Sequence, residues 1–200
     1  MRLKLIGLSV LLITLPLILP IQCLARADEA EIVTTLGDVK DTVDKDKRLH
    51  IEVTASMNAP ADKVYDALIH PENVAKYDSR ITNIKIVSRD ANGETVEYTG
   101  QTMPIPNAPP SFRVKYSFDA ATKSVTAKSA SQSPIQFENH TGLNPSKDGK
   151  GTDIKFTGVS SSTGKIMGFE PSEGMRKQFA VSSFMRQMHN VGMYIQKGGK

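Results

Sequence analysis

The chain contains one cysteine, Cys23, and no tryptophan among its 200 residues. Cys23 lies within an apolar N-terminal run, so a chain that loses this run has no thiol. Without a thiol it can have neither a disulfide nor a cysteine nucleophile, and it suits an oxidising compartment. Cysteine-based catalysis is therefore excluded for the remainder of the chain.

Motifs for other kinds of catalysis and for metal binding are also missing. The segment "GVSSSTG" at 158–164 is not a nucleophile elbow, and "NGETVEYTG" at 92–100 is not a phosphate-binding loop. No metal-ligand spacing connects the four histidines, which are His50, His70, His140 and His189. We therefore expect no catalytic residue, no bound metal ion and no cofactor.

Net charge is also small once the N-terminal run is set aside. The whole chain has 25 Lys and Arg against 21 Asp and Glu, but residues 1–27 hold three of the basic residues and no acidic one. The remainder has 22 basic and 21 acidic residues, a net charge of +1. This balance gives no electrostatic basis for binding nucleic acid.

Residues 1–27 have the layout of a secretory signal peptide. Positive charge in "MRLK" precedes a long apolar run, and "ARA" at 25–27 places small residues before Asp28. A retained membrane anchor is the main alternative, although Pro16 and Pro20 interrupt the run. A lipoprotein anchored at Cys23 is a weaker alternative, since lipidation usually requires a small residue before the cysteine and Gln22 is not small. We expect export to a periplasm or to the cell exterior.

Residues 28–47 are charged and weakly periodic, so we expect a tether there, with a domain from 48 to 200. Within the domain, apolar and polar residues alternate as in strands with one buried face. In "LHIEVTASM", for example, Ile51, Val53 and Met57 share a face. The expected strands are 49–57, 81–88, 94–100, 111–119, 123–129, 134–142 and 151–159.

A long helix is expected at about 172–197, between Pro171 and the Gly198–Gly199 pair. Its apolar stripe is centred on Met188, which we expect to face a cavity. Phe179 lies on the opposite side of the helix, which a one-sided helix does not explain.

Two short helical segments interrupt the strands near the start of the domain. Pro60 opens "ADKVYDALI" and Pro71 opens "ENVAKY", each at a favourable helix-start position. Short helices of this kind can close the end of a bent sheet. We therefore expect an α+β helix-grip fold. Its curved antiparallel sheet has about seven strands, two short helices follow the first strand, and the C-terminal helix lies across the concave face.

This order, and "APADKVYDALIHPENVAKYDSRI" in particular, resembles the START-like or SRPBCC superfamily. That superfamily includes polyketide cyclases, birch-pollen-allergen-like proteins and lipid-transfer START domains. His70 replaces the usual acid before Pro71-Glu72, Tyr77 stands where tryptophan is common, and the glycine-rich loop of the pollen allergens is absent. The resemblance covers about 49–197 and implies a hydrophobic cavity that binds a lipid or another small apolar molecule.

The cavity is expected between the sheet and the C-terminal helix. Long loops at 101–111, 129–134 and 158–172 carry apolar side chains that either line its mouth or plug the core. Met185 and Met188 could line a tolerant pocket or simply fill the core. The expected ligand-binding residues are Tyr98, Met103, Ile105, Phe112, Val114, Tyr116, Phe137, Phe156, Met167, Phe184, Met185, Met188 and His189.

Three functions compete on this basis. The first is an exported, non-catalytic carrier of a small apolar ligand such as a lipid, sterol-like, quinone or polyketide-like compound, in transient contact with membranes. The second is a cyclase or dehydratase that uses a tyrosine or histidine of the same cavity. The third is an envelope interaction protein with a filled core, which binds partners through Arg113, Lys115 and Lys128. The oligomeric state is left open.

Overall fold

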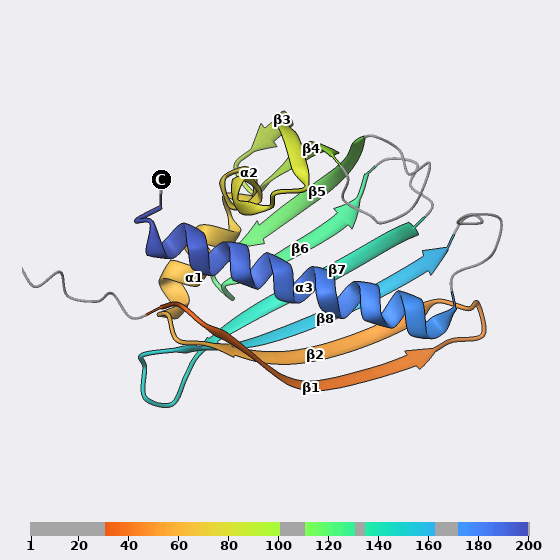
Figure 1. The fold of residues 1–200 in the computed structure, drawn as a ribbon, viewed down its shortest axis with the longest axis horizontal. Helices are drawn as coiled ribbons and strands as arrows, with labels where there is room; N and C mark the ends of the chain where they lie inside the picture. Colours follow the sequence, from red (N-terminus) through yellow and green to blue (C-terminus); the bar gives the residue numbers. More distant parts are fainter. Residues whose placement is uncertain (1–30, 101–110, 131–134, 163–171, 200) are drawn as a thin grey trace, which may run out of the picture.

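A computed structural model describes residues 31–100, 111–130, 135–162 and 172–199. Its centre is one antiparallel sheet with the strand order β1-β2-β8-β7-β6-β5-β4-β3 (Figure 1). The strands are β1 Thr34–Val43, β2 Leu49–Met57, β3 Ile81–Asp90, β4 Gly93–Gly100, β5 Ser111–Asp119, β6 Ser124–Ser129, β7 Ile135–Pro145 and β8 Thr152–Ser162. The expected α+β helix-grip fold is confirmed, with eight strands instead of about seven.

The additional strand is β1, which lies in the segment expected to be a tether. It pairs with β2 from Thr34 opposite Met57 to Val43 opposite Leu49. The Asn58 side chain fixes the start of this pairing, because its Oδ1 accepts from the Val33 amide at 2.6 Å. The domain therefore begins well before the expected boundary at residue 48. The weak apolar pattern of β1 follows from its position at the edge of the sheet, because an edge strand buries few side chains.

Strand β2 shows how alternation builds the core. Its residues alternate between buried and more exposed along the whole strand, with Leu49, Val53 and Met57 almost inaccessible to solvent. The register places Val53 opposite Phe156 of β8, so apolar side chains from neighbouring strands share the concave face. One face of the sheet therefore forms the core while the other carries polar residues.

Two short helices follow β2 and close one end of the sheet (Figure 1). Helix α1 spans Ala61–Leu68, and helix α2 spans Pro71–Val74 and continues into the 3-10 turn η1, Ala75–Tyr77. Pro60 precedes α1 and Pro71 is the first residue of α2, as the sequence predicts. The break between the helices lets the chain turn while both bury apolar side chains.

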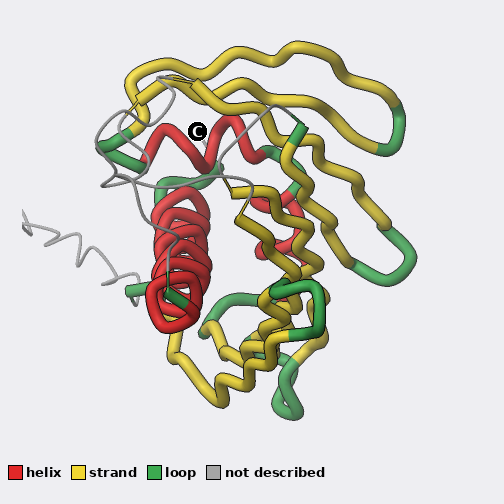
Figure 2. Tube along the Cα trace, turned by 90° about the vertical axis from the view of Figure 1, so that its right-hand side faces the viewer, coloured by secondary structure: helices red, strands yellow, loops and turns green. Residues whose placement is uncertain are grey.

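Helix α3, Glu173–Gln196, lies across the concave face. It begins at Ser172, whose hydroxyl accepts from the Met175 amide at 3.2 Å. Figure 2 looks nearly along this helix and shows the strands curving around it. Its apolar side chains contact the sheet, and the Phe156 and Phe184 rings lie 4.8 Å apart. In the described ranges, no helix combines the length and apolar character needed to cross a membrane.

Candidate functional site

A cavity of about 250 Å³ lies between α3 and the concave face of the sheet. Its wall is mainly apolar and comes from most strands of the sheet, from α2 and from α3. Seven of the residues predicted to bind ligand line it: Tyr98, Phe112, Val114, Tyr116, Phe137, Phe156 and Phe184. Six of these belong to strands, where alternation alone identifies the concave face. Whether they bind a ligand stays a prediction.

The other six predicted residues are placed differently. Met103, Ile105 and Met167 lie outside the described residues, as do most of the expected mouth loops. Met185, Met188 and His189 are on α3 but do not line the cavity. Met188 is completely buried in the packed core, and His189 is exposed.

The reason is that α3 has two inward faces. Its apolar stripe, which includes Val181, Met188 and Val191, belongs to the packed core, and α3 as a whole contacts α1, α2, η1, β1, β2 and β8. The cavity face lies roughly 120° around the helix at 3.6 residues per turn. It carries Arg176, Phe179, Ser183, Gln187 and Asn190. The off-stripe position of Phe179 was the sequence signal for this second face.

Two tyrosines of the cavity wall form a buried hydrogen-bonded pair. The Tyr98 and Tyr116 hydroxyl oxygens are 2.9 Å apart, and the Tyr98 ring stacks on Phe112 with centroids 5.2 Å apart. Burial raises the pKa of Tyr116 to about 12 and raises the pKa of Tyr98 well above 10. Both phenols are therefore neutral over the physiological pH range and can donate hydrogen bonds.

A buried acidic cluster lies beside this pair. Glu94 of β4 is opposite Tyr116 in the strand register, and its side chain is fully buried. Arg89 contacts two carboxylates: its Nε donates to Glu94 at 2.7 Å and its terminal nitrogen to Glu72 of α2 at 3.0 Å. Burial raises the pKa of Glu94, and the negative charge of Glu72 raises it further while Arg89 opposes both.

This cluster was not predicted from the sequence, although the sequence contains a signal for it. Glu94 shares a face with Val96 and Tyr98 in a strand that alternates cleanly, which places a carboxyl group on the buried side. One oxygen of Glu94 and one of Glu72 have no hydrogen-bond partner among the described residues. Neither glutamate is part of the cavity wall, so the cluster lies beside the tyrosines but outside the cavity.

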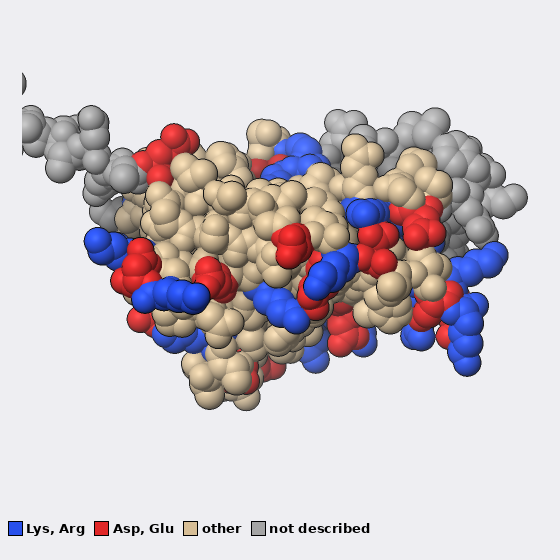
Figure 3. Space-filling view, turned by 90° about the horizontal axis from the view of Figure 1, so that it is seen from below, with Lys and Arg blue, Asp and Glu red and all other residues tan. Residues whose placement is uncertain are grey.

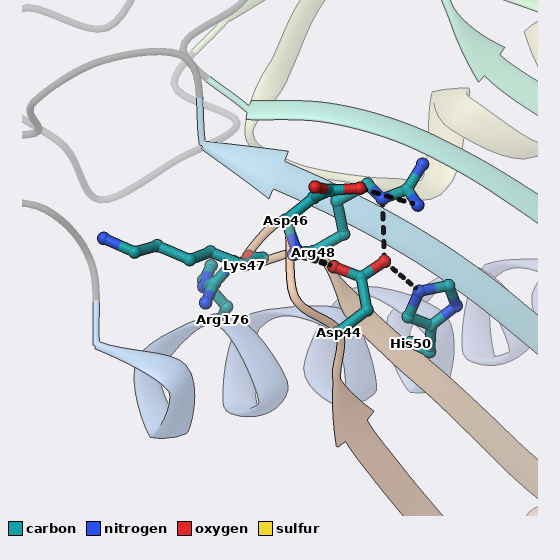
Figure 4. Close-up of polar contacts among 6 residues, drawn as sticks. All are labelled: Asp44, Asp46, Lys47, Arg48, His50 and Arg176. Atoms are coloured by element: carbon teal, nitrogen blue, oxygen red, sulfur yellow. Dashed lines mark hydrogen bonds and ion pairs between the residues drawn. The ribbon is translucent and has the colours of Figure 1, made fainter.

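The N-terminal end of α3 is connected to the turn between β1 and β2 (Figure 4). Arg176, which lines the cavity, donates to the Lys47 carbonyl oxygen at 2.8 Å. Asp44 holds the turn by accepting from the Arg48 amide and from His50, each at 2.9 Å. The bond from His50, followed by that from the Arg48 amide, lowers the pKa of Asp44 strongly. The turn that connects β1 to β2 therefore supports one end of the cavity.

Basic residues on the outer face of the sheet are mostly paired. Arg113 bonds Glu97, and Lys128 lies 3.0 Å from Glu138. Basic and acidic side chains also lie next to one another on the face seen from below in Figure 3. His140 is exposed on the outer face, as its strand position predicts. Within the part of the chain that the structure describes, no three His, Cys, Asp or Glu side chains group as metal ligands.

No protein-family model and no curated protein matches the sequence. Solved structures do match. The Zhui aromatase/cyclase from Streptomyces sp. R1128 aligns with a TM-score of 0.60 at 14% identity, covering 76% of this chain and 98% of that one. Ara h 8.0201 aligns with a TM-score of 0.58 at 16% identity, covering 74% of this chain and 99% of that one. Human STARD10 aligns with a TM-score of 0.55 at 15% identity, covering 80% of this chain and 74% of that one. The chain therefore has the fold of the START-like, or SRPBCC, superfamily.

Proposed function

We propose that this protein is an exported, non-catalytic carrier of a small apolar molecule held between the sheet and α3. The observation that supports this is the cavity, whose strand-side wall is built from Phe112, Val114, Phe137 and Phe156. Its volume of about 250 Å³ is slightly below the usual range for ligand sites, which favours a compact ligand over a lipid with two acyl chains.

Apolar burial alone gives such a cavity useful affinity. Removing about 300 Å² of ligand surface from water at roughly 25 cal/mol per Å² contributes on the order of 7 kcal/mol, before the cost of association is subtracted. A carrier needs no more than this, because its ligand must also be released. Sterol-like, quinone and polyketide-like compounds are the ligand classes that fit this description.

Export is supported by the arrangement of residues 1–27, and it would place the carrier where apolar molecules have to cross water. We expect the mature chain to begin at Asp28. N-terminal sequencing of the protein from the periplasm or medium tests this, and recovery of an intact N-terminus from the membrane fraction would contradict it. Flotation with neutral and anionic vesicles tests the proposed transient membrane contact.

The carrier function is tested by expressing the full chain in a bacterial host and purifying it without detergent. Native and denaturing mass spectrometry are then compared. We expect a mass difference that disappears on denaturation and an apolar compound in the solvent extract. An uncharged fluorescent naphthylamine should also bind to the ligand-free protein. Absence of both a co-purifying compound and probe binding would refute the proposal.

The tyrosine pair favours one alternative, an enzyme of the cyclase or dehydratase type. Tyr98 and Tyr116 present a neutral hydroxyl in the cavity wall, and the buried Glu94 is the cross-strand neighbour of Tyr116. Such an enzyme would convert the extracted compound when the two are incubated, and Tyr116→Phe would slow that conversion. An extracted compound that stays unchanged would favour the carrier.

A further inference from the structure

The strand side of the cavity is mainly apolar, whereas the α3 side mixes apolar and polar side chains. The strands contribute mainly aromatic and aliphatic side chains. Helix α3 contributes Phe179, Ala180, Phe184 and two arginines, together with the uncharged polar side chains of Ser183, Gln187 and Asn190. These three are spaced four and three residues apart, so they form one row along the helix. A cavity for a plain hydrocarbon would have no need of this row.

Asn190 is the member of the row whose position is hardest to explain by folding alone. It is 5% exposed and lines the cavity, and no described residue forms a hydrogen bond with its side chain. A primary amide has two N–H donors and an oxygen that accepts, and buried polar groups nearly always have partners. The Asn190 amide is therefore open to a partner in the cavity.

The tyrosine pair adds a second polar group to the same cavity. One hydroxyl proton is used in the 2.9 Å bond between Tyr98 and Tyr116. The other is free to donate, because neither hydroxyl bonds any further described residue. An amide and a phenol are both uncharged here, and they match a neutral carbonyl or hydroxyl oxygen better than a carboxylate or phosphate.

Four arginines also line the cavity: Arg80, Arg113, Arg176 and Arg186. Arg80 is paired with Asp78 at 2.8 Å, and Arg176 donates to the Lys47 carbonyl oxygen. Arg113 is paired with Glu97, but the Nε of Arg176 is buried without a hydrogen-bond partner among the described residues. Among the uncharged amide side chains that line the cavity, that of Asn190 is more than nine-tenths buried, and no described residue forms a hydrogen bond with it.

We infer that the ligand is a compact apolar molecule with a neutral carbonyl or hydroxyl oxygen, and that Asn190 binds this oxygen. This inference rests on the proposed carrier function and specifies the chemistry of its ligand. Asn190 then acts as the specificity residue: the strand side recognises apolar area, and the helix recognises the oxygen.

The test compares two probes that differ by one oxygen, phenanthrene and 9-phenanthrol, in titrations of the full chain. The measured quantity is the ratio of their affinities in the wild type and in Asn190→Leu, which keeps the side-chain size but removes the amide. One lost hydrogen bond should weaken 9-phenanthrol binding about tenfold and leave phenanthrene binding unchanged. Gln178→Leu is the matched control, because Gln178 is an exposed amide on α3 outside the cavity wall.

A measurement on the wild type makes the test independent of how the variant folds. We expect 9-phenanthrol, but not phenanthrene, to shift the side-chain amide resonances of Asn190 in ¹H–¹⁵N spectra. An unchanged affinity ratio in Asn190→Leu, or equal shifts with both probes, would overturn the inference while leaving the carrier function intact. Preferential binding of phenanthrene-9-carboxylate would overturn it in favour of an anionic ligand. Failure of every probe to bind would instead refute the carrier function itself.

Discussion

Filling the cavity from α3 is the most direct way to show that the space exists. Ala180 lines the cavity and is only partly buried, so Ala180→Leu should extend a larger side chain into it. Alanine and leucine are both strong helix formers, which keeps the change in helix propensity to a few tenths of a kcal/mol. Any larger effect therefore reports on the space around the side chain.

The magnitude follows from the added carbons. Leucine has three more carbon atoms than alanine, and burying each contributes about 0.8 kcal/mol. The upper limit is thus about 2.4 kcal/mol, and with imperfect fit we expect a gain of about 1–2 kcal/mol in the free energy of unfolding. In a domain of this size, that gain raises the thermal midpoint by roughly 2–8 °C. Probe binding should fall, because the leucine occupies part of the 250 Å³.

Urea denaturation and titration with the uncharged naphthylamine measure the two quantities on the same ligand-free preparation. Ser182→Leu is the control, because it places the same side chain on the exposed side of α3 and should leave probe binding unchanged. If Ala180→Leu lost about 1 kcal/mol or more and still bound the probe normally, the space beside Ala180 would be filled by protein. That result would refute an open cavity at this position of α3.

Three further predictions concern the core, the acidic cluster and the edge strand. Met188→Trp should cost about 1–3 kcal/mol in urea denaturation, because Met188 is completely buried in the core; a neutral result would place it beside open space. The pKa of Glu94 is raised in the folded protein, so its protonated form stabilises the fold. This contribution is complete below about pH 4.5 and is lost as the pH rises through the raised pKa. Glu94→Gln should therefore be more stable than the wild type at pH 7 but similar at pH 4, and equal differences at both pH values would contradict the assignment. A chain starting at Lys47 lacks β1 and should melt several degrees lower in calorimetry, whereas an unchanged midpoint would show that β1 adds nothing.

The sequence alone was sufficient for most of the fold and for the strand side of the site. Alternation in β2, β4 and β5 identified the concave face, because successive side chains of a strand point to opposite sides of a sheet. The helix-start prolines at 60 and 71 located α1 and α2 correctly. Phe112, Val114 and Tyr116 line the cavity for the same reason that they alternate with polar neighbours.

Only the tertiary structure determined the helix side of the site. The periodicity of α3 shows which face of the helix is apolar. It does not show where the sheet contacts the helix and where a space remains between them. The apolar stripe around Met188 belongs to the packed core, and the cavity lies beside the neighbouring face with Ser183 and Asn190. Strand β1 was missed for a related reason: an edge strand is held mainly by backbone hydrogen bonds, which leave little trace in the side-chain pattern.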